Sequence, residues 1–166
     1  VPEAARAMKP LVGANTTVLP LQNGVDAASQ LVDVLGSDSV IGGLCRIVSF
    51  VVEPGHIRHA GFKPSIITGE LDNRRSRRIA TIDQLFKRAG VEITIATDIQ
   101  VALWTKFLFI ASYSGVAALA NAPAGVLRAD PQRRSQMLNA MQEIHTLAHA
   151  RGINLPPDSI DTVMAS

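Results

Sequence analysis

The sequence predicts an α/β region of short strands and helices over residues 1–96, followed by an all-helical region over residues 97–166. Three observations support this division. Short runs of β-branched residues, separated by Gly or Pro, lie before residue 96. Long apolar segments with helical spacing follow Asp98. Hydrophobic residues make up 47% of the 166 residues, which is enough for a folded core.

The amino-terminal part predicts a helix, a strand, a turn and a second helix, an alternation typical of a parallel α/β sheet. The first helix covers residues 2–11, with Pro2 in its first turn. Residues 16–21 are apolar and rich in β-branched side chains, which indicates a buried strand. Asn23-Gly24 then turns the chain, and residues 27–35 form the second helix.

Residues 39–70 are rich in β-branched side chains and are interrupted by Gly and Pro. This pattern predicts three or four short strands in an antiparallel meander. Asn73 is a suitable N-cap for a helix over residues 74–89, whose apolar side chains share one face. A last short strand is expected over residues 91–95.

The remaining residues predict three helices. The first covers residues 99–121, with Asp98 as its N-cap. The second covers residues 131–151 and is capped by Asp130. The proline pair and aspartate of residues 156–158 open the third helix.

Composition and charge narrow the class of protein. A net charge of +2 is too small to indicate a nucleic-acid partner. A single cysteine, Cys45, excludes an intramolecular disulfide and fits a reducing cytosol. The longest apolar run, Val101 to Ala120, is interrupted by Lys106, so we expect no membrane span. Because the chain starts at Val1 and ends inside a predicted helix, we expect a piece of a longer protein.

Lys106 is the most informative side chain, because it lies in a long apolar helix. Counting by four places Ile110 and Ser114 on the same helical face. A lysine with apolar surroundings can lower its pKa and donate a proton to a substrate. The alternative is an ordinary lysine that faces solvent from an amphipathic helix.

Asn23-Gly24 is the second candidate, because it follows a predicted strand. The carboxyl ends of strands in an open α/β sheet are where such proteins bind ligands. The alternative is a plain turn without a ligand.

Other polar patterns are weaker. His145 and His149 have the spacing of metal ligands on a helix, but no third ligand is evident, so we expect no metal. The arginines of residues 74–78 form either a solvated face or a grip on an acidic neighbour. The sequence contains neither of the two common glycine-rich phosphate-binding motifs, GxGxxG and GxxxxGK followed by Ser or Thr. A binding site for dinucleotide phosphates would therefore lie outside it.

A series of short motifs gives these residues a common setting. They are Leu21-Gln22-Asn23-Gly24-Val25, Gly42-Gly43, the segment Gly55–Gly61, Ile67-Thr68-Gly69-Glu70, Ala89-Gly90-Val91, Asp98-Ile99 and Leu103-Trp104-Thr105-Lys106. In this order, and over nearly its whole length, the chain resembles the ketopantoate reductase (2-dehydropantoate 2-reductase) family. The asparagine-glycine and tryptophan-lysine motifs, about 80 residues apart, are the specific ones.

The resemblance implies both a fold and an activity. Residues 1–96 would be the end of a Rossmann nucleotide-binding domain with short extra strands. Residues 97–166 would be a truncated helical domain like the carboxyl-terminal domain of 6-phosphogluconate dehydrogenase. The implied reaction is the NADPH-dependent reduction of a 2-oxo acid, ketopantoate to pantoate, in cytoplasmic pantothenate biosynthesis. The cofactor phosphates would bind before Val1, and a homodimer is possible.

The resemblance also assigns site residues. Lys106 matches the catalytic lysine that acts as general acid, and Asn23 with Gly24 matches the element that contacts substrate and nicotinamide. Ser114 and Ile110 stand where the family commonly has substrate-binding asparagines. The resemblance therefore does not fix the identity of the substrate. Two alternatives therefore remain: a relative that reduces a different 2-oxo acid, and a non-catalytic helical interaction module. Neither a nucleic-acid nor a membrane partner is expected.

Overall fold

The computed structural model describes residues 1–165, apart from the side chains of residues 124, 125 and 128. Its internal contacts divide the chain into two compact units. One, here called the α/β unit, contains Val1–Gln22 and Asp26–Ile99. The other, the helical unit, contains Asn23–Val25 and the chain from Gln100 onward. The predicted fold class, an α/β part with short extra strands followed by an all-helical part, is confirmed: the structure has a small three-stranded mixed sheet with helices, followed by a helical part.

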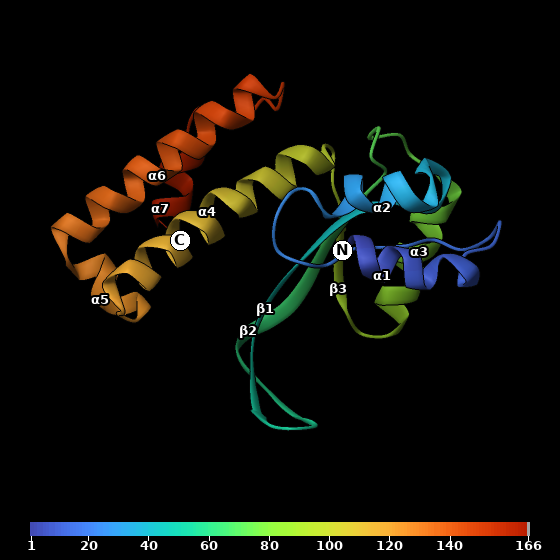
Figure 1. Cartoon of the computed structure of the whole chain (residues 1–166), viewed down its shortest axis with the longest axis horizontal. Helices are drawn as coiled ribbons and strands as arrows, with labels where there is room; N and C mark the ends of the chain where they lie inside the picture. Colours follow the sequence, from blue (N-terminus) through green and yellow to red (C-terminus); the bar gives the residue numbers. More distant parts are fainter. Residues whose placement is uncertain (166) are drawn as a thin grey trace. The chain divides into compact units, whose positions relative to one another are not determined.

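The α/β unit begins with helices, continues with two consecutive strands, and ends with a third α-helix and a third strand (Figure 1). Its helices are α1 (Pro2–Met8), α2 (Ala27–Leu35) and α3 (Arg77–Arg88), with short 3-10 helices η1 (Lys9–Leu11) and η2 (Ser37–Ser39). Its strands are β1 (Gly42–Glu53), β2 (His56–Gly69) and β3 (Glu92–Ile95). β1 pairs antiparallel with β2, and β2 pairs parallel with β3. The predicted helices and the last strand are thereby confirmed.

The predicted meander of three or four short strands is wrong, because β1 and β2 form one long hairpin (Figure 1). Only Pro54-Gly55 turns the chain between them. Gly61 and Pro64, which suggested further turns, lie inside β2. A shift in the pairing register between Arg46 and Val48 accommodates them, as a bulge does.

The predicted strand over residues 16–21 is reduced to a single bridge. Val18 pairs in parallel with Val40, and no named strand covers this segment. The segment still packs closely on the sheet, because a Cβ added to Gly43 would overlap the side chain of Leu19. Val40 also joins the buried core between α1 and α2, together with Ala5 and Leu31.

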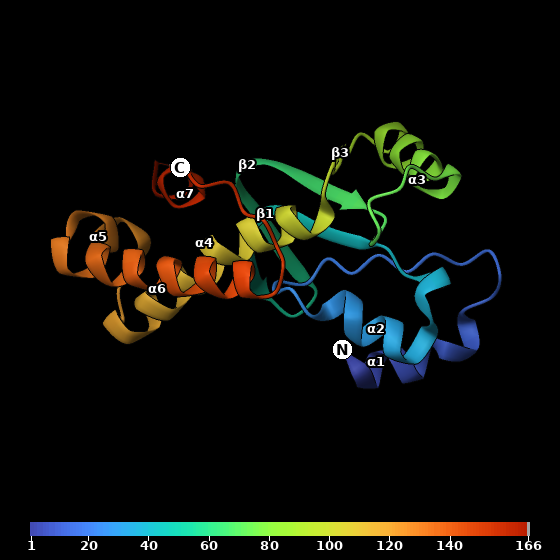
Figure 2. The same ribbon diagram turned by 90° about the horizontal axis from the view of Figure 1, so that it is seen from above.

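The helical unit contains the rest of α4 (Ile99–Ala120), followed by α5 (Ala124–Ala129), α6 (Pro131–Ala150) and α7 (Ser159–Ala165). α6 lies alongside α4 in both views (Figures 1 and 2). Asp130 caps α6, since its carboxylate accepts hydrogen bonds from the backbone N–H groups of Gln132 (2.8 Å) and Arg133 (3.3 Å). The predicted cap is confirmed, whereas α5 was not predicted.

One predicted cap, Asn73, binds a different helix from the one expected. Asn73, predicted to cap α3, does not do so: the N-cap of α3 is Ser76, whose Oγ accepts a hydrogen bond from Ile79 N (3.2 Å). The side-chain oxygen of Asn73 instead accepts a hydrogen bond from the backbone N–H of Ile99 (2.9 Å), the first residue of α4. Its partner is 26 residues away, which sequence periodicity cannot reveal.

α4 is long and apolar enough to cross a membrane by length and composition alone. Its most apolar window of 18 residues is 28% buried within the chain. Core helices of water-soluble proteins meet the same criterion, so α4 carries little information about a membrane.

Candidate active site

α4 carries two opposite faces within the helical unit. The buried face contains Trp104, Leu108, Ser112 and Val116, at intervals of four residues, and Leu103 beside Trp104 is buried as well. Lys106 and Ile110 are half-buried and Ser114 is exposed. Each lies two residues after a member of the buried face, about 200° around the helix. Lys106 therefore leaves α4 on the side opposite its packed face.

The residues beside Lys106 are held firmly. Trp104 is 3% exposed and packs in the core against Ala148 of α6. Its ring meets Phe107 edge to face, with the centroids 5.8 Å apart. The Arg151 guanidinium lies over the same ring at 5.9 Å, within cation–π range. These contacts hold the turn of α4 that carries Lys106 against α6.

Asn23 and Gly24 belong by their contacts to the helical unit, as do Lys106 and Ser114. The next residue, Val25, packs against the cluster that contains Trp104, two residues before Lys106. Gly24 has φ 107°, a conformation that side-chain-bearing residues rarely adopt. This turn leaves the amide of Asn23 exposed. The structure thus brings the two predicted elements into one unit.

Ile110 and Ser114 extend the Lys106 face by one and two helical turns. The Ile110 side chain can form no hydrogen bond. Among these three residues, the polar groups are therefore the Lys106 ammonium and the Ser114 hydroxyl, two turns away. Lys106 is therefore the one cation on α4, and the residue one turn after it, Ile110, is apolar.

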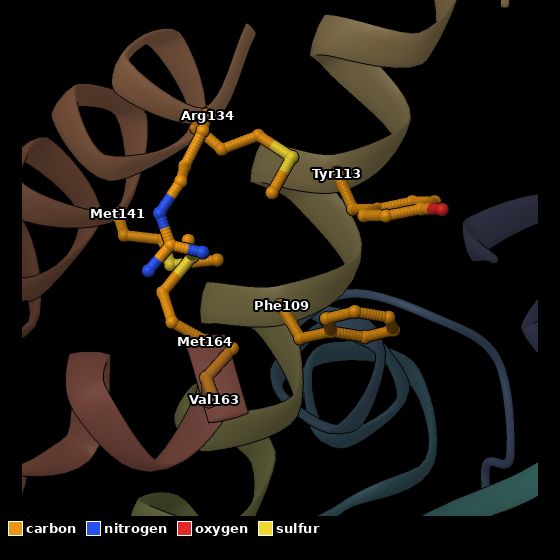
Figure 3. Close-up of a pocket in the computed structure, with 7 residues that line it drawn as sticks. Phe109, Tyr113, Arg134, Met141, Val163 and Met164 are labelled. Carbon is orange, nitrogen blue, oxygen red and sulfur yellow. The ribbon is translucent and has the colours of Figure 1, made fainter. Parts of the chain in front are cut away.

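A small cavity lies between α4, α6 and α7 (Figure 3). Phe109 and Tyr113 project from one side of α4, with ring centroids 5.2 Å apart, and Arg134 extends from α6 toward Met141 and Met164. The volume of this cavity is about 50 Å³. Small-molecule sites commonly have roughly 300–1,000 Å³, so this cavity is no substrate site by itself.

An ion pair between the buried Glu70 and the half-buried Arg78 anchors the loop that precedes α3. Glu70 is 3% exposed, and its carboxylate accepts hydrogen bonds from Arg78 Nε (2.7 Å) and from Ser76 Oγ (2.5 Å). The Arg78 guanidinium holds the pKa of Glu70 below its usual value, against the opposing effect of burial. Arg78 also donates to the backbone carbonyl of Val40 (3.3 Å) and to that of Asp38. Of the four arginines in residues 74–78, Arg78 thus binds an acidic neighbour, Glu70.

A metal centre has no support in the described part of the chain. Within residues 1–165, no three His, Cys, Asp or Glu side chains lie close enough together to hold an ion. His145 and His149 face each other with ring centroids 4.6 Å apart, and among the described atoms His145 Nε2 is buried without a hydrogen-bond partner.

Sequence patterns missed the contacts at the start of α4. The Asn73 oxygen binds the backbone of Ile99, and the Ile99 side chain fills space beside Gly42 and Gly69. The available signal was the pair of glycines, which the motifs included, but their common partner lies 30 or more residues away.

Comparison with known proteins identifies the setting of this site. The family model "Ketopantoate reductase PanE/ApbA" matches residues 1–73, and its companion, "Ketopantoate reductase PanE/ApbA C terminal", matches residues 98–166. The 2-dehydropantoate 2-reductase of Nostoc sp. is 29% identical over 164 residues, covering 96% of this chain and 51% of the relative. The uncharacterized oxidoreductase YkpB of Bacillus subtilis is 29% identical over 150 residues, covering 90% of this chain and 50% of the relative. The chain spans about half the length of these relatives.

Solved structures give the same result. The 2-dehydropantoate 2-reductase of Geobacter metallireducens is 29% identical, with a TM-score of 0.87, over 95% of this chain and 53% of that one. D-mandelate dehydrogenase, solved with NADH, shares the fold at 14% identity and a TM-score of 0.89, over 99% of this chain and 55% of that one. Together with the two family models, these similarities show that the chain belongs to the ketopantoate reductase family of oxidoreductases.

Proposed function

We propose that the complete protein reduces a 2-oxo acid to the corresponding 2-hydroxy acid, with Lys106 as the general acid. Ketopantoate is the first candidate substrate, which would place the enzyme in pantothenate biosynthesis. The observation that carries the proposal is the position of Lys106. This cation leaves α4 opposite the packed face, in the unit that also holds Asn23.

The proposed chemistry is simple. The Lys106 ammonium lies next to the carbonyl oxygen, stabilises the negative charge that develops there, and donates the proton that completes the alcohol. Asn23, whose amide offers both a donor and an acceptor, orients the substrate beside the lysine. Gly24 permits the turn that presents this amide.

The cofactor we propose is a nicotinamide dinucleotide, which supplies the hydride when bound. NADPH follows from the family resemblance, whereas the related D-mandelate dehydrogenase was solved with NADH. The residues of this chain are suited to bind only the nicotinamide end of the cofactor. The exposed Asn23 amide fits a polar group there, and a glycine-rich phosphate loop is not part of this sequence. We therefore expect residues 1–166 alone to be inactive.

Ile110 favours a second candidate function, the reduction of a different 2-oxo acid. A ketopantoate hydroxyl would find no hydrogen-bonding partner at this half-buried position, whereas an apolar substituent would pack there. D-mandelate dehydrogenase shows that the fold also occurs in an enzyme named for another acid. A substrate with an apolar side chain is therefore the alternative.

A purely structural role is the remaining alternative, and it concerns the far end of α4. Leu119 is 80% exposed, whereas Val116 is 5% exposed and packs with Leu127 and Met137. A subunit contact at this end of α4 would therefore use the exposed Leu119. We propose a homodimer in the cytosol, and a catalytically inert dimer is the outcome to test against.

The test is a panel of 2-oxo acids with NADPH and NADH, measured as cofactor oxidation by the complete protein. We expect turnover of at least one acid, and Lys106→Ala should remove most of it. Replacing Ile110 by Asn restores the residue common in the family and should raise kcat/KM for ketopantoate by about 10-fold, the value of one added hydrogen bond. If no acid is reduced with either cofactor, the enzyme proposal fails and the structural role is favoured.

A further inference from the structure

The first residue of α4 is unusually well anchored. Ile99 is fully buried, at 0% exposure. Its side chain lies against two glycines of the hairpin: a Cβ added to Gly42 would overlap Ile99 Cγ1, and one added to Gly69 would lie 3.3 Å from Ile99 Cβ. Gly42 and Gly69 are themselves paired across β1 and β2. The two glycines therefore leave a niche that the Ile99 side chain fills.

The backbone of Ile99 is fixed as well. Its N–H donates to the Asn73 side-chain oxygen at 2.9 Å, which satisfies one of the free donors at the start of a helix. Asn73 has φ 61°, a left-handed conformation that asparagine tolerates better than most residues. Its own N–H donates to Glu70 O (3.1 Å).

The loop that carries Asn73 is tied down at both ends. Glu70, at the end of β2, is buried and bonded to both Ser76 and Arg78. Arg78 in turn donates to Val40, two residues before Gly42. The polar bonds and the glycine niche thus converge on the start of α4.

Lys106 lies seven residues after Ile99 on the same continuous helix, about two turns and roughly 10 Å along its axis. A displacement or rotation of the helix start is carried along this length, because the intervening backbone is helical throughout. We propose that Ile99, seated between Gly42 and Gly69, is a positioning residue for Lys106. This inference rests on the proposed function, and it adds a residue that touches no reacting atom.

The first test changes the size of the side chain on each side of the niche. Gly42→Ala crowds Ile99, and Ile99→Ala empties the niche. Each should lower kcat in the complete protein by about 10-fold or more, since misplacement of a catalytic group by about 1 Å can cost 10²-fold. The double variant, in which the added methyl group occupies the vacated space, should recover kcat to within about 3-fold of wild type, a recovery expected of coupled neighbours. A double variant whose losses simply multiply would overturn the proposal.

The second test separates positioning from general stability. In a Lys106→Ala background, Gly42→Ala should lower kcat by less than about 2-fold, because no lysine remains to be misplaced. The dissociation constant of NADPH, measured by fluorescence titration, should stay unchanged in all variants. An equal loss of kcat with and without Lys106 would mean that the niche acts only on folding.

Two further variants guard against unfolding and against ambiguity. Ile99→Val removes one carbon and should fold, with a kcat loss that is smaller but again confined to the protein with Lys106. Asn73→Gly keeps the left-handed backbone and removes the cap, whereas Asn73→Asp keeps an acceptor and should behave as wild type. If Lys106→Ala itself retains the wild-type kcat, the proposed function fails first. If it abolishes activity while the niche variants do nothing, only the positioning role is wrong.

Discussion

The two units differ in how completely their buried polar groups are hydrogen-bonded. In the α/β unit, Glu70 is paired with Arg78, and the buried Thr68 hydroxyl donates to Gly42 O at 2.7 Å. In the helical unit, the buried Ser159 hydroxyl donates to Pro156 O at 2.6 Å, but Ser112 Oγ and His145 Nε2 are buried without partners among the described atoms. Buried polar groups stabilise only when they are satisfied. Buried polar bonds therefore contribute more to the stability of the α/β unit, whereas the helical unit depends more on apolar packing along α4.

The largest effect should come from breaking the ion pair. Arg78→Met leaves the Glu70 carboxylate buried and unpaired, which we expect to lower the free energy of unfolding by about 3 kcal/mol. Arg77→Met is the matched control, because Arg77 is exposed on the same helix and its loss should change stability by less than about 0.5 kcal/mol. Urea denaturation followed by circular dichroism measures both. Equal stabilities of the two variants would contradict the polar account of the α/β unit.

Acid should weaken the same pair. Arg78, followed by Ser76, lowers the pKa of Glu70 from its ordinary value of 4.5. A depressed carboxyl pKa stabilises the fold above the unfolded value and loses this contribution as the pH falls through the folded pKa. Stability should therefore drop as the pH falls below about 4.5.

Thermal unfolding between pH 7 and pH 3 is the measurement, with Arg78→Met for comparison. In that variant Glu70 has lost the partner that lowers its pKa most, so the stability of the variant should fall less steeply in this window. Two parallel curves would show that Glu70 is not the titrating group.

The smallest effects should have opposite signs in the two units. Ser112→Ala removes a buried hydroxyl without a described partner and should be neutral or stabilise by up to about 1 kcal/mol. Thr68→Val removes a hydroxyl of the α/β unit that is bonded to Gly42 O, and should destabilise by about 1 kcal/mol. Chemical denaturation of the pair measures the difference. If Ser112→Ala is the more destabilising of the two, the contrast between the units is wrong.

Local patterns predicted the local parts of the fold. α2 and α6 follow apolar spacing, and Asp130 caps α6 as expected, because all the groups involved lie within a few residues. The hairpin was misjudged because Gly61 and Pro64 are tolerated only through pairing with a distant strand. Asn73 was assigned to the nearer helix for the same reason: its partner, Ile99, is remote in sequence.

The candidate site also has features that the sequence predicted and features that it did not. Lys106 was conspicuous as a charge within an apolar run, and Asn23 followed from a turn after a predicted strand. Sequence alone left open which side of α4 carries the lysine, since nearly every residue around it is apolar. It also offered four arginines without showing that Arg78 is the one that binds Glu70.

The most direct test of the account is kcat for Lys106→Ala in the complete protein, with the acid that the wild type reduces best. Loss of a general acid commonly costs about 10²–10⁴-fold, so we expect kcat to fall by at least about 100-fold while the NADPH dissociation constant stays unchanged. Lys87→Ala, which removes an exposed lysine paired with Asp83, should keep wild-type activity. A Lys106→Ala enzyme that retains kcat within about 3-fold of wild type would contradict the assignment of the catalytic acid.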